Sequence, residues 1–144
     1  MMLRYLLGAC AVAVVACGCG GDGKIAPVSG VVTLNGKPVA DVAVTLQPIA
    51  AEGNNSPGPA SFGVSGPDGR YTVKLVGEET RGATVGKNQV RFSAHAVPTD
   101  FSEEGLKKAK ATVKIPSRYW YESKLEFDVP AEGTTSADFQ LTSP

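Results

Sequence analysis

Beyond residue 19 this chain of 144 residues has no cysteine, and its whole length holds a single histidine, His95. A disulfide framework or a zinc site built from Cys and His ligands is therefore excluded from the body of the chain. Lys and Arg total 14, and so do Asp and Glu, so no basic stripe indicates a nucleic-acid partner. Outside the N-terminus, no apolar run is long enough to cross a membrane as a helix.

Sequence motifs for catalysis are missing as well. The chain has no G-x-S-x-G nucleophile turn and no phosphate-binding P-loop. Asp68 has no acidic neighbours at the spacing of a calcium site, so we interpret it as a turn-capping residue. The sequence therefore predicts no catalytic residue, no metal ligand and no cofactor, and it favours a protein that is not an enzyme.

The first 16 residues predict a bacterial lipoprotein signal peptide. Arg4 supplies a positive start, and residues 5–16 form an apolar stretch that is short for a membrane span. The stretch ends in Val14-Val15-Ala16-Cys17, which resembles a lipobox because a small residue directly precedes the cysteine. In such signals diacylglycerol is attached to the cysteine thiol, and a peptidase cleaves the chain before that cysteine.

Three cysteines are candidates for this lipid. The length of the apolar stretch favours Cys17, with Cys19 as the alternative, whereas Cys10 has too few apolar residues before it. A plain secretory signal cleaved near Gly18 is the remaining possibility. With Cys17 lipidated, residues 17–26 are a flexible tether, and each buried acyl CH₂ contributes about 0.8 kcal/mol to membrane binding. Gly18, in place of Asp, favours the outer membrane.

From Pro27 onward, apolar residues recur at every second position, which is typical of half-buried β-strands. No segment supplies the crossover helices that a parallel sheet needs. For residues 27–144 we predict one all-β domain, an antiparallel two-sheet sandwich of about seven strands. The expected strands lie at 28–34, 42–47, 71–75, 90–95, 113–115, 124–129 and 137–141.

Turn residues separate these runs. Asn35-Gly36 predicts a tight hairpin, and Pro67-Asp68-Gly69 predicts a turn before the Tyr71 strand. Residues 50–60 are a polar loop rich in Gly and Pro. Residues 96–111 are either a short helix capped by Ser102 or a mobile loop.

Four segments together resemble a known family. They are 28–42 (VSGVVTLNGKPVADV), 66–73 (GPDGRYTV), 85–90 (VGKNQV) and 115–119 (IPSRY). In this order, behind a lipobox, they are similar to the carboxypeptidase regulatory-like domains found in small lipoproteins of planctomycete type. The resemblance implies a transthyretin/prealbumin-like, Ig-like sandwich. It carries over no catalytic residues, and the C-terminal Leu141-Thr142-Ser143-Pro144 differs from that of the transthyretin-like hydroxyisourate hydrolases.

Tyr119, Trp120 and Tyr121 form an aromatic cluster beside Arg118. The cluster is either a ligand contact, able to stack a sugar ring or anchor a partner protein, or a plug that buries Tyr119 and Trp120. We favour the plug. Because neighbouring side chains in an extended chain point to opposite sides, at least one of the three rings is expected to be exposed.

The expected function follows from anchor and fold. We expect a non-enzymatic lipoprotein held on a membrane of a bacterial cell envelope, with its domain facing the periplasm or the exterior. Its partners are the membrane itself and another envelope protein or a surface polysaccharide. The alternatives are a carbohydrate-binding module that uses the aromatic cluster and an enzyme whose site has no recognised motif. His95 is expected on the solvated face of its strand.

Overall fold

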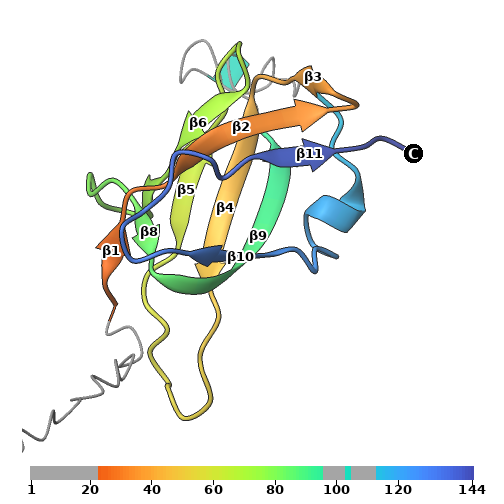
Figure 1. Cartoon of the computed structure of the whole chain (residues 1–144). Helices are drawn as coiled ribbons and strands as arrows, with labels where there is room; N and C mark the ends of the chain where they lie inside the picture. Colours follow the sequence, from red (N-terminus) through yellow and green to blue (C-terminus); the bar gives the residue numbers. More distant parts are fainter. Residues whose placement is uncertain (1–22, 96–102, 105–112) are drawn as a thin grey trace, which may run out of the picture.

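The computed structural model of the chain describes residues 23–95, 103–104 and 113–144 (Figure 1). As predicted, this part is mostly β-structure. One turn of 3₁₀ helix, η1 (Ser117–Tyr119), precedes the last two strands. The strands are β1 (Ile25–Ala26), β2 (Ser29–Leu34), β3 (Lys37–Pro38), β4 (Val42–Pro48), β5 (Ser61–Val64), β6 (Arg70–Thr72), β7 (Lys74–Leu75), β8 (Ala83–Thr84), β9 (Gly86–Ala94), β10 (Glu126–Val129) and β11 (Phe139–Leu141).

In the described part of the chain, the strands form two larger sheets and one small sheet. The first is antiparallel throughout, in the order β10-β9-β4-β5-β7. The second is centred on β2, which pairs with β11, β3 and β6. Strands β1 and β8 form a short antiparallel pair beside them (Figure 1). The prediction of an all-β structure is confirmed, and most of the strand pairs are antiparallel as expected.

Both larger sheets contribute to one hydrophobic core. Val32 of β2 and Leu141 of β11 lie in it together with Val44 of β4 and Phe92 of β9, and all four are almost completely buried. Along β4 and β9 the predicted period of two is visible, since Gln47 of β4 and Arg91 of β9 are exposed while the neighbours of each on both sides are buried. The shared core is consistent with the predicted arrangement of two facing sheets.

The prediction of an antiparallel two-sheet sandwich of about seven strands is corrected in two respects. Eleven strands are present among the described residues, several of them only two residues long. Strand β11 runs parallel to β2, with Phe139 opposite Val32, and Val28 and Thr134 form a further parallel bridge. Two strands far apart in sequence need no tight turn to pair, so either direction is available to them.

Two expected strands also differ. The run 71–75 is divided at Val73, because β6 pairs with β2 whereas β7 pairs with β5. The buried Val73 thus marks the point where the chain changes sheets. Val113 and Ile115 are not in a strand, although both pack partly buried against the core. Strand β5 was not predicted, because the residues that it buries are Ser61 and Gly63, whereas the apolar Phe62 and Val64 are only half-buried.

The predicted turns are confirmed in their backbone geometry. Asn35 and Gly36 have φ values of 52° and 81°, as a tight hairpin turn requires. This hairpin joins β2 to the short β3, while β4 lies in the other sheet. At the second turn, Asp68 Oδ1 accepts a hydrogen bond from Arg70 N at 3.1 Å, which is the turn-capping role expected of it.

The segment 96–111 lies outside the described residues apart from Glu103 and Glu104, which are helical and exposed. The choice between a helix capped by Ser102 and a loop therefore stays a prediction. Ile25 and Ala26, at the end of the expected tether, are already part of the sheet as β1. Within the described ranges, no helix has both the length and the apolar character needed to span a membrane.

Candidate functional site

The aromatic cluster lies on a short turn that begins after Pro116. Pro116 has an extended backbone, and η1 follows it, with Tyr119 N bonded to Pro116 O at 3.0 Å and Trp120 N bonded to Ser117 O at 2.9 Å. Ser117 Oγ donates to Glu122 Oε2 at 2.7 Å and so closes the turn from the other side. The backbone direction at the cluster is therefore fixed by local hydrogen bonds.

The C-terminal side of this turn is attached to β9 through Ser123. Ser123 is buried, and its hydroxyl donates to Val90 O at 2.5 Å. The side chain of Gln89 donates in return to Ser123 O at 2.8 Å. A buried serine that is hydrogen-bonded to β9 holds the turn at a fixed distance from the core.

The N-terminal side is attached to the end of the chain through Thr142. Arg118 donates to both the carbonyl oxygen and Oγ1 of Thr142, and Thr142 N donates to the Tyr119 hydroxyl at 3.1 Å. The Arg118 guanidinium also lies 4.8 Å from the centre of the Tyr119 ring. Hydrogen bonds from the side chain and backbone of Thr142, followed by Arg118, lower the pKa of Tyr119 to about 8.

The expected plug is only partly formed. Tyr119 is half-buried and packs edge-on against Phe92, with ring centres 6.5 Å apart. Trp120, however, is 54% exposed and Tyr121 is 69% exposed, so the expectation that Trp120 is buried was wrong. Because Tyr119 takes the inward position of the turn, the two residues after it are carried outward. Trp120 and Tyr121 contact each other edge to face, with ring centres 5.8 Å apart.

Trp120 also borders a surface pocket of about 340 Å³. The pocket has a mixed lining in which the polar residues Lys114 and Ser93 accompany apolar ones. An exposed indole beside such a pocket offers a flat apolar face and hydrogen-bonding groups to the same ligand. The lining residues are Phe92, Ser93, Ala94, Val113, Lys114, Ile115 and Trp120.

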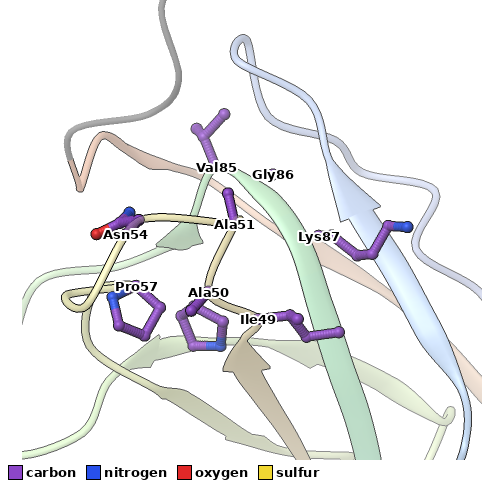
Figure 2. Close-up of a pocket in the computed structure, with 9 residues that line it drawn as sticks. Ile49, Ala50, Ala51, Asn54, Pro57, Val85, Gly86 and Lys87 are labelled. Carbon is purple, nitrogen blue, oxygen red and sulfur yellow. The ribbon is translucent and has the colours of Figure 1, made fainter.

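A second pocket, of about 390 Å³, lies between the β4–β5 loop and the start of β9 (Figure 2). Its walls are mainly apolar, from Ile49, Ala51, Pro57 and Val85 among others, and the side chain of Asn54 is at its edge. Sequence reasoning identified the loop but not the pocket, because the two walls come from segments about thirty residues apart, a pairing that local patterns do not encode.

The other residues singled out from the sequence are also located. His95 directly follows β9 and is half-buried, with the Phe62 ring edge-on at 5.9 Å, so the expected position on a solvated strand face is corrected. Cys10, Cys17 and Cys19 lie outside the described residues, so the lipid-attachment prediction has no structural counterpart here. Among the residues that are described, no three His, Cys, Asp or Glu side chains gather as metal ligands would.

Comparisons with protein-family models, with curated proteins and with solved structures found no match.

Proposed function

We propose that this chain is a non-enzymatic lipoprotein of a bacterial cell envelope, in which a lipid on Cys17 holds a β-domain that binds a partner. The outer membrane is the favoured location. The binding surface is the exposed pair Trp120 and Tyr121, with the pocket beside Trp120. The observation that carries this proposal is the outward position of these two rings on a turn that is tied down on both sides.

Exposed aromatic rings on a rigid support suit binding. Large rings that become buried on association supply much of the binding energy of an interface, and a rigid turn loses little entropy when it binds. Here Arg118 ties the turn to Thr142, and Ser123 ties it to Val90. The rings are therefore presented in a defined orientation before any partner arrives.

The domain type we propose is the carboxypeptidase regulatory-like, transthyretin-like sandwich. Two motifs of that resemblance support the proposal by their position. Residues 29–31 of the first motif pair with residues 70–72 of the second as neighbouring strands β2 and β6. A common structural unit is a reason for the two motifs to occur together in one sequence.

The anchor is tested by metabolic labelling with a fatty-acid analogue in a bacterial host. We expect label on the wild-type chain and on Cys19→Ser, and none on Cys17→Ser. If the label is retained in Cys17→Ser and lost in Cys19→Ser, the lipid is attached to Cys19. A chain without label in any form contradicts the lipoprotein proposal.

The binding surface is tested by chemical crosslinking in the native envelope, followed by affinity capture and mass spectrometry. Trp120→Ala is expected to lose its crosslinked partner. Val76→Ala serves as the matched control, because Val76 is also an exposed apolar residue, at 61%, but lies after β7. A partner that is retained equally by both variants contradicts the assignment of the surface.

A carbohydrate ligand is the second candidate, and the Trp120 indole beside Lys114 and Ser93 favours it. A sugar presents apolar C–H groups on one face and hydroxyls at its edge, which match a ring and a polar pocket wall. Glycan-array binding that is lost in Trp120→Ala supports this candidate. Array binding that is unchanged in that variant contradicts it.

A further inference from the structure

Three segments distant in the sequence meet at one end of the domain. Val85 N donates to Lys24 O at 2.8 Å, so the chain enters the fold beside the start of β9. Ile49 N donates to Lys87 O at 2.9 Å, and Thr84 Oγ1 donates to Pro59 O at 2.9 Å. The β4–β5 loop, residues 49–60, therefore projects at the end where β1 begins, and β3 lies at the opposite end (Figure 1).

The reach of the tether sets how far this end can lie from a membrane. Six residues, 18–23, separate Cys17 from Lys24. Fully extended, six residues span about 20 Å, and a Gly-rich chain of that length has a root-mean-square span of about 13 Å. Four of the six are glycine. A lipid on Cys17 thus keeps the loop end of the domain at the bilayer surface, at a high effective concentration.

The surface at this end combines apolar residues with charges that balance, because Glu52 in the loop and Lys24 at its base are both exposed and of opposite sign. Ile49 is 39% exposed beside the pocket of Figure 2, and Ala50 and Ala51 next to it are exposed. Lys87 Nζ lies 3.6 Å from Glu126 Oε2, so its charge is matched locally. Because these charges sum to about zero, contact between the apolar residues and lipid should depend little on the charge of the headgroups.

We propose that this end is a membrane-contact surface, in which Ile49 and the apolar mouth of the adjacent pocket rest on the phospholipid layer that holds Cys17. The inference rests on the proposed lipid anchor and adds an orientation to it. The loop end faces the bilayer, while β3 faces away from it (Figure 1). Lipid is the occupant because the tether holds this surface within about 20 Å of the bilayer at full extension and on average closer.

The test uses the mature acylated chain, reconstituted in vesicles, with a Cys19→Ser background that removes the second thiol. An environment-sensitive fluorophore is attached at Ile49→Cys, or at Lys37→Cys as the matched control. Lys37 is an exposed residue of β3 at the far end of the domain. The vesicles are zwitterionic or anionic and carry a nitroxide quencher on their acyl chains.

We expect a blue shift and quenching of the fluorophore at position 49 and neither change at position 37. The effect is expected to be similar in both vesicle types and to persist at high salt. Equal quenching at the two positions, or none at 49 in chains that float with the vesicles, overturns the membrane contact. Quenching that disappears with salt overturns its apolar nature. Failure to float at all overturns the lipid anchor itself, so the two proposals fail in distinguishable ways.

Discussion

Replacing Tyr71 with phenylalanine removes one hydroxyl from the core and leaves the ring in place. Tyr71 is 3% exposed, and its hydroxyl donates to the carbonyl oxygen of Ala137 at 2.5 Å. The two residues are 66 positions apart, and the bond joins β6 to the segment that leads into β11. Ala137 itself is completely buried, so water does not replace the lost donor without a local opening.

The magnitude follows from these two facts. A neutral hydrogen bond contributes about 1 kcal/mol net, and a buried carbonyl left without its donor costs about a further 1 kcal/mol or more. We therefore expect Tyr71→Phe to lower the free energy of unfolding by about 2 kcal/mol. For a domain of this size that corresponds to a fall in Tm of about 8 °C.

Urea unfolding followed by far-UV circular dichroism measures this change, with an unaltered m value indicating that only stability has changed. Tyr121→Phe is the matched control, because it removes the same hydroxyl from a side chain that is 69% exposed. It should alter stability by less than about 0.5 kcal/mol. If Tyr71→Phe proves no less stable than Tyr121→Phe, the buried hydroxyl does not hold β6 to the β11 segment.

The same variant has a signature in pH. Burial, with a smaller effect of the Asp138 charge, raises the pKa of Tyr71 above its ordinary value of 10.0. Above that pH the unfolded chain releases a proton that the native protein retains, so this contribution to stability is complete below pH 10 and declines as pH rises. The difference between wild type and Tyr71→Phe should therefore shrink between neutral pH and pH values above 10. A difference that stays constant contradicts the burial of the hydroxyl.

Two further predictions concern the close approach of Gly30 to Ala137 and the contacts that join Tyr119 and Arg118 to Thr142. A Cβ on Gly30 would lie 2.0 Å from the Ala137 carbonyl oxygen. Gly30→Ala should therefore lower the free energy of unfolding, measured by chemical denaturation, by about 3 kcal/mol. Gly66→Ala is the control and should be close to neutral, because a Cβ there has no neighbouring atom nearer than 3.5 Å. Equal stability of the two variants would contradict the close approach. Ultraviolet titration should show one tyrosine ionising near pH 8 that is absent in Tyr119→Phe and moves upward in Arg118→Gln. Because the pKa of Tyr119 is lowered in the folded protein, its contribution to the free energy of unfolding should rise between pH 8 and pH 10. A titration without a tyrosine that ionises near pH 8 refutes the contacts of Tyr119 with Thr142 and Arg118.

The candidate site was only partly predictable. The cluster Tyr119–Tyr121 is evident in the sequence, and alternation predicts that not all three rings can be buried. Which ring turns inward depends on the contact of Tyr119 with Phe92 and on the bonds of Arg118 to Thr142. Those partners lie more than twenty residues away, so no local pattern indicates them.

What the sequence determined by itself is local. The period of two in β4 and β9 predicts which side chains face the core, because a strand places alternate residues on opposite faces. Asn35-Gly36 and Pro67-Asp68-Gly69 predict turns, because their backbone preferences act within a few residues. The expected N-terminal signal is local in the same sense, since it rests on the order of charge, apolar length and small residues, and it stays a prediction.

Only the tertiary structure decided which strands pair and which segments share a surface. Three features join residues that are far apart in the chain. They are the parallel pairing of β11 with β2, the change of sheet at Val73, and the meeting of Lys24, Ile49 and Val85 at one end. Such contacts are selected by packing in a common core and by the pairing of backbone groups, and a short stretch of sequence specifies neither partner nor direction. The exposure of Trp120 is decided in the same way, since it follows from the inward position of the ring beside it.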